Sequence, residues 1–417
     1  MTDSLTPLQA EQRLLALELF GMRFGLDRMR RLATALDHPE RAFRSVHVVG
    51  TNGKSSTARM LAAILSAHGH RTGAYLSPHL GSFWERIRVD DADIAPDRFA
   101  AAIERALRAA QRVNRAGEEG DVVTQFELLT AAAYSELAAQ GVEMAVIEAG
   151  LGGRYDATNV IGSEVQVLTS VGLDHTRWLG STIAEIAREK LDVVRPGATL
   201  VLGAGLHPDA ESVAELLAAE RGARIVHAGA DPGVPVAALG AFQRRNFAAA
   251  RAAAEALLGT LDPAAVAAAA EVRIPGRMQV TGERPLTVLD GAHNPDGIAA
   301  LAEALPEIAG GRRLVAVVSI LDDKDARSML ARLTPICDAL VLTASRNPRS
   351  LPPSALRALV APAGPEIETV AEPERALERG RALATADGVV VATGSLYLVA
   401  DLLAPPQRAA GRQASRL

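Results

Sequence analysis

Only one cysteine, no excess of basic charge and no long apolar run occur in this sequence of 417 residues, and each of these features excludes a class of protein. The one cysteine, Cys337, cannot form an internal disulfide, and nothing else indicates secretion. The segment Met1–Arg13 lacks the apolar core of a signal peptide, and no apolar run approaches the length of a membrane span. The net charge of −5 offers no basic face for nucleic acid. We therefore expect a cytoplasmic protein that binds neither membranes nor nucleic acids.

The rest of the composition is that of a globular protein with room for two or three domains. Short apolar runs alternate with helical patterns, which predicts an α/β fold with mostly parallel sheets. The expected strands form two series, first Ser45–Val49, Glu143–Ile147, Val165–Ser170 and Thr199–Gly203, then Leu286–Leu289, Leu314–Ser319, Ala339–Thr343 and Val389–Thr393. The second series is expected to build its own sheet. We place the boundary within Gly276–Arg284, between domains of residues 1–280 and 281–417.

A glycine-rich turn, Gly50–Gly53, lies between the first expected strand and a helical pattern. Glycines let a phosphate approach the backbone closely, and the unpaired N–H groups at a helix start attract its negative charge. Lys54 adds a full positive charge, while Ser55 or Ser56 can contact a magnesium ion. The loop is a shorter variant of the standard form, because Val48 stands where its first glycine usually lies. An ordinary turn is the alternative, but strand, glycines and helix together favour nucleotide binding.

Polar residues follow three further expected strands, at the sheet edge where α/β enzymes carry their chemistry. Glu148, before the glycine-rich run Gly150–Arg154, is expected to be a second magnesium contact, and a glutamate that only caps a turn is the alternative. Asp174 and His175 follow the next strand, where an imidazole can bind a metal or be an ordinary loop residue. The cluster Asp290–Pro295 has the polar density of a site, although a tight capped turn would look similar.

Lys190 falls on the apolar face of an expected helix. Thr182 and Glu185 predict a capping box at the start of this helix, and Ile186 lies one turn before the lysine on the same face. The pattern alone favours snorkelling, in which the stem is buried and the amine reaches water. A buried lysine could instead be an activated or covalently modified group.

Motifs spread over residues 50–397 resemble, in the same order, those of the folylpolyglutamate synthase/dihydrofolate synthase family, a branch of the Mur ligase superfamily. The matching segments are Gly50–Lys54, Ser77–Leu80, Glu85–Ile87, Thr124–Glu127, Glu148–Asn159, Asp174–Thr176, Leu179–Gly180, Glu189–Lys190, Gln243–Asn246, Pro275–Arg277, Asp290–Pro295, Asp323–Asp325 and Gly394–Tyr397. The segments at 77–80 and 290–295 separate this branch from the peptidoglycan ligases. The resemblance implies an N-terminal P-loop ATPase domain with a mostly parallel sheet and a smaller, C-terminal Rossmann-like α/β domain.

The resemblance also implies roles for individual residues. The phosphates of ATP would be held by Thr51, Asn52, Gly53, Lys54, Ser55 and Ser56, and the nucleotide site completed by Asn246, Arg277 and Asp290. Magnesium, or manganese in its place, would be held by Ser77, Glu148 and His175. The pterin side of the substrate would meet Thr124, Gln125, Phe126, Glu127, Tyr155, Asp156 and Ala157. The incoming glutamate would meet His293 and Ser395. Catalysis would depend on Lys54, His175, His293 and a carbamylated Lys190.

Two positions depart from the family pattern. The family usually has glycine after the loop lysine, where this chain has Ser55. A serine there would stiffen the loop or offer another hydroxyl. The family usually has histidine before Gln243, where this chain has Phe242, so any polar contact from that position is lost.

The implied activity is an ATP-dependent ligase that joins L-glutamate to dihydropteroate, to the glutamate tail of tetrahydrofolate, or to both, in folate biosynthesis and one-carbon metabolism. Phosphoryl transfer from ATP would turn a carboxylate into an acyl phosphate, which the amine of glutamate attacks. Because an acyl phosphate must be kept from water, closure of the two domains is expected. A ligase for muramoyl peptides and a nucleotide-binding module without turnover are the alternatives. A monomer is expected.

Overall fold

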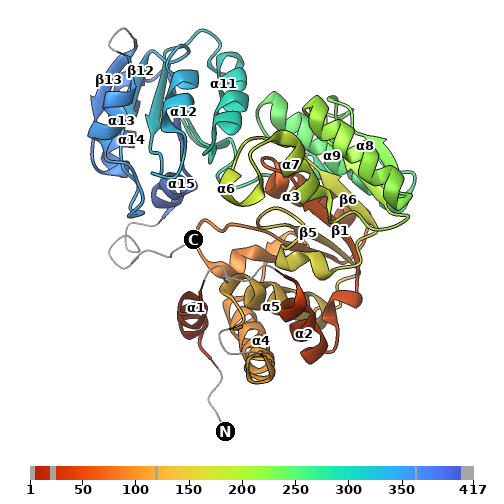
Figure 1. The fold of residues 1–417 in the computed structure, drawn as a ribbon. Coiled ribbons are helices and arrows are strands. Elements are labelled where there is room, and N and C mark those ends of the chain that lie inside the picture. The colour runs from red at the N-terminus through yellow and green to blue at the C-terminus, as the bar shows by residue number, and fades with distance from the viewer. Residues whose placement is uncertain (1–4, 19–24, 118–120, 362–363, 405–417) are drawn as a thin grey trace. The chain divides into compact units, whose positions relative to one another are not determined.

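The structure, a computed structural model, describes residues 5–18, 25–117, 121–361 and 364–404, which form two compact units (Figure 1). The first unit comprises the described residues up to Val236 together with Arg245–Val272, and the second comprises Ala237–Arg244 and the described residues from Arg273 onward. Each unit has its own, mostly parallel sheet, so the predicted α/β class is confirmed. No helix in the described residues is long and apolar enough to cross a membrane.

The first unit is built on an eight-stranded sheet in the order β4-β3-β2-β5-β1-β6-β7-β8. The six strands from β2 to β8 in this order are parallel, and β3 and β4 add an antiparallel edge. The strands are β1 Arg44–Val49, β2 Thr72–Tyr75, β3 Ile87–Val89, β4 Ala92–Asp93, β5 Met144–Glu148, β6 Val165–Leu168, β7 Thr199–Leu202 and β8 Arg224–His227. The four strands predicted for this part are therefore confirmed within one or two residues at each end.

Helices pack on this sheet through separate apolar clusters. One cluster joins α1, α2, α4 and α5 to Ala145 and Ile147 of β5, and another joins α7 and α8 to β6 and β7. Helix α3 contacts β1, β2 and β5, and α10 packs on α3. The helices are α1 Pro7–Leu15, α2 Asp27–Ala35, α3 Lys54–Ala67, α4 Pro96–Ala116, α5 Gln125–Ala139, α6 Thr176–Leu179, α7 Ile183–Leu191, α8 Pro208–Arg221, α9 Ala241–Leu258 and α10 Pro263–Ala269, with short 3-10 turns at η1 Pro39–Arg41, η2 Phe83–Arg86 and η3 Ala157–Val160.

The second unit has a six-stranded sheet in the order β13-β12-β11-β14-β10-β9, of which only β9 is antiparallel. The strands are β9 Gln279–Glu283, β10 Leu286–Leu289, β11 Leu314–Val318, β12 Ala339–Leu342, β13 Glu366–Thr369 and β14 Val389–Thr393, and the helices are α11 Pro295–Ala309, α12 Ala326–Leu333, α13 Pro353–Leu359, α14 Pro373–Ala384 and α15 Leu396–Leu403. All four strands predicted for this part are present. Strands β10 and β14 pair directly, so the segments that follow them share one edge of the sheet.

The division between the units differs from the boundary expected at 280/281. Strand β9 pairs with β10, so the chain enters the second sheet before residue 281. The segment Ala237–Arg244, which includes the first turn of α9, also belongs to the second unit. Its Phe242 packs against the apolar core of that unit, and a Cβ at Gly240 would lie only 2.9 Å from the phenylalanine ring. The aromatic residue that departs from the family pattern is thus part of this packing.

Candidate active site

The glycine-rich turn that we predicted to bind phosphate directly follows β1, the strand between β5 and β6, and leads into α3. Gly50 and Gly53 have φ angles of 154° and 85°, which favour glycine. A Cβ at Gly50 would clash with Thr169, and one at Gly53 would lie 2.5 Å from Asn246 Oδ1. Both glycines are therefore required by the fold, and Asn246 of α9 lies against the turn.

The segment after β6 holds this turn by backbone and hydroxyl contacts. The amide of Thr51 donates to Ser170 O at 2.9 Å, and the amide of Asn52 donates to Ser170 Oγ at 2.9 Å. The amide of Gly172 donates in turn to Thr51 Oγ1 at 3.0 Å. The shape of the turn is thus set by its neighbours in the sheet.

Two lysines meet at one carbonyl of the turn. Lys54 Nζ donates to Gly50 O at 3.0 Å and to Thr51 O at 3.3 Å. Lys190 Nζ, which comes from α7, donates to the same Gly50 O, also at 3.0 Å. When both amines are protonated they repel each other at this one oxygen, so positive charge is concentrated at the turn.

The interpretation of Lys190 as a snorkelling lysine is wrong. Lys190 is only 3% exposed, because its side chain points from α7 toward the turn and does not reach water. Burial and, after it, the charge of Lys54 lower the pKa of Lys190 from 10.5 to about 7. The predicted capping box at Thr182 and Glu185 is present at the start of α7. A large fraction of Lys190 is therefore a neutral amine at physiological pH.

Glu148, the last residue of β5, connects α3 with the segment after β2. Its Oε1 accepts from Ser55 Oγ at 2.8 Å, and its Oε2 accepts from the amide of Ser77 at 2.9 Å. The carboxylate is buried, and so is Ser56, the next residue of α3. The serine at position 55, where the family usually has glycine, supplies a hydroxyl to this carboxylate. Glu148, Ser55 and Ser77 thus form one cluster of oxygen donors next to the turn.

His175 lies in a different setting. It begins α6 with a left-handed φ of 52°, its side chain is 44% exposed, and its Nε2 is 3.9 Å from Asp174 Oδ1. In the described ranges, no three His, Cys, Asp or Glu side chains gather into a metal site. An ion at Glu148 would therefore need hydroxyl, water or phosphate oxygens among its ligands, and magnesium commonly takes such ligands.

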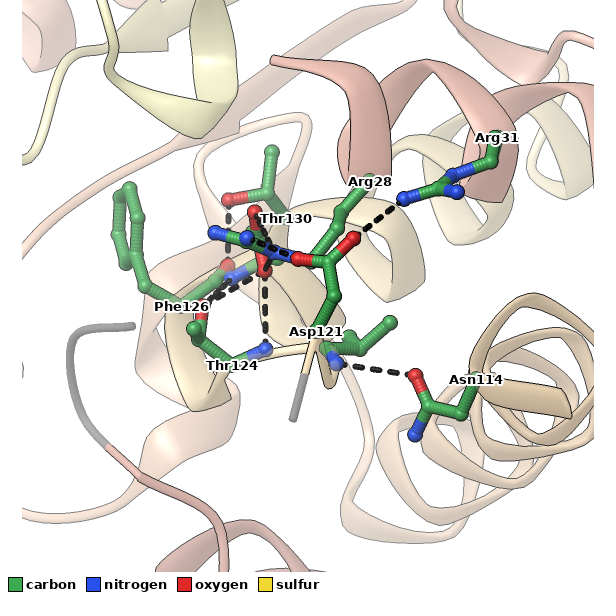
Figure 2. A network of polar contacts seen from close by, with 9 residues as sticks. Arg28, Arg31, Asn114, Asp121, Thr124, Phe126 and Thr130 are labelled. Carbon is green, nitrogen blue, oxygen red and sulfur yellow. Dashed lines mark hydrogen bonds and ion pairs between the residues drawn. The ribbon is translucent and has the colours of Figure 1, made fainter. Parts of the chain in front are cut away.

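The start of α5 is held by a network of charged groups (Figure 2). Arg28 of α2 donates through Nε to both oxygens of Glu127 at 3.0 Å and through Nη1 to Asp121 at 2.6 Å, while Arg31 also reaches Asp121. Glu127 accepts as well from the amide and the hydroxyl of Thr124, which completes a capping box. These hydrogen bonds with Arg28 hold the pKa of Asp121 below its usual value.

Most of the residues expected to line the pterin side have partners inside the protein. Gln125 donates to Leu14 O at 2.9 Å, and Thr124 and Glu127 belong to the network just described. Phe126 is half-buried; a Cβ at Gly150 would lie 2.5 Å from its ring, so the ring covers the turn after β5.

The second part of the expected pterin side divides in the same way. Asp156 is buried, and its Oδ2 accepts from the amide of Leu151 at 2.8 Å. Ala157, the first residue of η3, is buried as well. Tyr155 is 47% exposed, with Arg154 over its ring at 5.8 Å. Phe126 and Tyr155 are thus the residues of this set with the most surface for a ligand.

Asp290 follows β10 in the second unit and is buried. Its Oδ2 accepts from the amide of Met278 and its Oδ1 from the amide of Ala292, both at 2.9 Å. Burial raises the pKa of Asp290, although the charge of Arg277 opposes this. A Cβ at Gly291 would lie 2.9 Å from Arg277 Nη1, so the arginine lies against the same turn.

His293 and Ser395 reach the same edge of the sheet from β10 and β14. His293 Nδ1 donates to Gly291 O at 2.8 Å, which fixes the ring by its backbone. Ser395 is buried and accepts from the amide of Tyr397 at 3.1 Å as the N-cap of α15. The structure therefore gives Ser395 a structural contact.

Comparison with known proteins identifies relatives of this chain. The Mur ligase, glutamate ligase domain family matches residues 276–396. A dihydrofolate synthase/folylpolyglutamate synthase from Mycobacterium tuberculosis is 36% identical over 375 residues, which are 79% of this chain and 76% of that protein. The chain belongs to the dihydrofolate synthase/folylpolyglutamate synthase family. Members of this family are ATP-dependent ligases.

Solved structures of related enzymes match this family member over almost its whole length. The folylpolyglutamate synthase of M. tuberculosis complexed with ADP has a TM-score of 0.87 and 31% identity, and the match covers 98% of both chains. The bifunctional enzyme of Yersinia pestis complexed with AMPPNP and a manganese ion has a TM-score of 0.85 and 29% identity, and covers 96% of this chain and 98% of that one.

Some contacts of this folylpolyglutamate synthase relative were not predicted from its sequence. Arg28 is one, because its carboxylate partners lie 99 and 93 residues further along the chain. His47 is another, since its place in an apolar strand gave no sign of a polar contact. No local pattern could have identified either pairing, because both depend on how distant segments fold together.

Proposed function

We propose that this protein is an ATP-dependent ligase that adds L-glutamate both to dihydropteroate and to the glutamate tail of tetrahydrofolate, through an acyl phosphate. One observation carries the proposal: in a chain of this family, the Gly50–Lys54 turn and Glu148 lie at the carboxyl ends of the adjacent strands β1 and β5. Ser55, the residue after the turn, donates to Glu148. We place the reaction in the cytoplasm and expect a monomer. The roles implied for Arg277, Asp290, His293 and Ser395 stay predictions.

Nucleotide binding is assigned to the turn after β1. The amides of Gly53 and the first turn of α3 would cradle the phosphates, and Lys54 would leave its backbone acceptors to neutralise the terminal ones. The ammonium group of Lys54 supports this assignment, because phosphate oxygens can replace the carbonyls of Gly50 and Thr51 as its acceptors. Asn246, which lies against Gly53, would contact the nucleotide.

A divalent ion fits the oxygen donors at Glu148. A buried carboxylate beside a serine hydroxyl is a hard donor set, which suits magnesium or manganese. When bound, the ion would supply positive charge to the phosphate being transferred. His175 would add a nitrogen ligand, whereas magnesium and manganese mostly take oxygen ligands.

The reaction follows from these parts. A carboxylate oxygen of the acceptor attacks the γ-phosphorus of ATP, ADP leaves, and the acceptor becomes an acyl phosphate. The amine of L-glutamate then attacks the acyl carbon, phosphate leaves, and an amide forms. Lys54 would stabilise the charge on the transferred group. Phe126 and Tyr155 are proposed to contact the pterin, while Thr124, Gln125, Glu127, Asp156 and Ala157 would fix their surroundings.

Phosphate release tests this function directly. We expect release only when ATP, L-glutamate and an acceptor are all present, with dihydropteroate and tetrahydrofolate each accepted in separate assays. A muramoyl peptide tested in parallel should give no release. Turnover with tetrahydrofolate alone would reduce the function to polyglutamylation, turnover with the muramoyl peptide would change the acceptor class, and nucleotide binding without turnover would indicate a binding module.

We further propose that Lys190 carries a carbamate in the active enzyme. The neutral amine nitrogen attacks the carbon of carbon dioxide, an N–C bond forms, and one proton leaves to solvent. Burial favours the amine form that reacts, since the pKa of Lys190 is about 7. The product is an anion, so the repulsion between Lys190 and Lys54 at Gly50 O would become an attraction.

The scarcity of lysine makes this carbamate testable by NMR. The chain has three lysines, Lys54, Lys190 and Lys324. With ¹³C-bicarbonate at neutral pH, we expect one carbamate resonance from the intact protein that is missing from Lys190→Gln and retained in Lys324→Arg. The α-amino group gives the same background in all three proteins. A spectrum of active wild type without such a resonance, or one that persists in Lys190→Gln, would contradict the assignment.

A further inference from the structure

His47 is a buried polar residue in β1 that none of the roles above uses. It lies three residues before Gly50, and its strand register pairs it with Ile147 of β5, in the cluster that packs under α5. The residue is fully buried. A polar ring in this position needs a partner, because an unpaired buried donor is costly.

The partner of His47 is a threonine of η3. His47 Nε2 lies 2.8 Å from Thr158 Oγ1, and the hydroxyl of Thr158 donates to Asp156 Oδ1. Because the hydroxyl has one proton and gives it to Asp156, it must accept from Nε2–H. Burial lowers the pKa of His47 to about 3, so the ring is neutral and its proton lies on Nε2.

Asp156 links Thr158 to the turn after β5 by hydrogen bonds. Its Oδ1 also accepts from the amide of Thr158 at 3.0 Å, and its Oδ2 accepts from the amide of Leu151 at 2.8 Å. Leu151 follows Gly150, the residue that the ring of Phe126 covers. A chain of hydrogen bonds thus runs from β1 through η3 to the turn beneath Phe126.

Other residues hold η3 from outside the sheet, but they do not replace His47. Tyr134 of α5 donates to Thr158 O at 2.9 Å, and Arg195 donates to Asn159 O at 2.7 Å. Both of these contacts are made to backbone carbonyls. His47 is the residue that orients the hydroxyl of Thr158, and through it the carboxylate of Asp156.

We propose that His47 is a positioning residue that holds the Gly150–Leu151 turn in shape for the pterin-bearing substrate, by fixing the Thr158 hydroxyl against the Asp156 carboxylate. The proposal rests on the proposed function, because it assigns the pterin to Phe126. It predicts that the loss of the Nε2 donor affects the folate substrate more than ATP, although His47 and the phosphate-binding turn share one strand.

Substitutions at both ends of the contact test the proposal. We expect His47→Leu to raise KM for dihydropteroate about tenfold, because one buried hydrogen bond is lost on the folate side. KM for ATP should change by less than about twofold. His47→Gln, whose amide can donate from nearly the same place, should recover most of this loss. Thr158→Val should behave like His47→Leu, and the double variant should be no worse than the more affected single one.

A matched control lies on the next strand. Gln166 of β6 is paired in register with His47 and is also fully buried, but its side chain bonds only to Ser163. Gln166→Leu should alter thermal stability without changing KM for dihydropteroate. Equal changes in both KM values for His47→Leu, or a change of the same size in Gln166→Leu, would overturn the proposal.

Hydrogen exchange makes the test independent of turnover. The amide of Leu151 should exchange faster in His47→Leu than in wild type, and at the wild-type rate in Gln166→Leu, as measured by NMR. An unchanged rate in folded His47→Leu would refute the positioning role. A wild-type protein that does not use dihydropteroate would instead refute the proposed function, and the exchange result would still decide the role of His47.

Discussion

Replacing Lys54 by alanine is expected to lower kcat by about 10²–10³-fold while the protein stays folded. The ammonium lost is the one that would face the phosphates of ATP during transfer. The fold should survive, because Gly50 O keeps Lys190 as a donor after Lys54 is removed. Steady-state phosphate release, measured beside circular dichroism and thermal unfolding, checks both parts of this expectation.

Lys54→Met serves as the matched variant, since it keeps the apolar stem and removes only the charge. It should lose as much activity as Lys54→Ala if the ammonium is what matters. An arginine elsewhere on the surface, such as Arg44, gives a control in which loss of a charge should change kcat by less than about twofold. Near-normal turnover in a folded Lys54→Met protein would remove the turn from the nucleotide site.

Glu148→Gln is expected to lower kcat by a similar factor, about 10²–10³-fold, and to raise the magnesium concentration needed for half-maximal activity. The amide has the size of the carboxylate but not its charge. The oxygen of the glutamine amide can still accept from the backbone amide of Ser77. Its NH₂ group can donate to Ser55 Oγ, and the hydroxyl of Ser55 can then donate to Ser77 O, which lies 3.3 Å from Ser55 Oγ in the wild-type chain. The hydrogen bonds to Ser77 and Ser55 are thus kept, so the expected loss is one of charge.

Glu164→Gln is the control for this substitution. Glu164 forms an exposed pair with Arg44, of a kind that contributes little to stability. Titrations of activity with magnesium and with manganese should be unchanged in Glu164→Gln and shifted in Glu148→Gln. If the two variants gave the same metal titration, Glu148 would have no part in binding the ion.

The strands that were predicted are those with a buried, β-branched run. Leu286–Leu289 and Val389–Thr393 were predicted with their exact ends, because buried valines and leucines stop abruptly at polar or glycine residues. Strands β8, β9 and β13 were not predicted, since each is largely exposed and lacks such a run. β2 is buried, but it contains Gly73, which lies close to Leu137 and Val142 and weakens the strand pattern.

The candidate site was predicted as a set of positions and not as a set of contacts. Gly50, Lys54 and Glu148 could be placed together, because parallel strands end at one edge of a sheet. The burial of Lys190 could not be predicted, since it depends on how α7 packs beside the turn. The hydrogen bonds between Arg28 and Glu127 likewise depend on two segments, far apart in the sequence, that meet in the fold.

Helix α9 is shared by the two units, so no single position in the chain separates them. Its first turn, with Phe242, belongs to the second unit, while Asn246, one turn later, lies against the phosphate-binding turn of the first. A fragment that encodes residues 273–417 alone would expose the apolar surface that Leu239 and Phe242 cover. A recombination event that exchanged the second unit between relatives would therefore have to include residues 237–244 as well. We expect residues 237–244 and the chain from residue 273 onward to be inherited together.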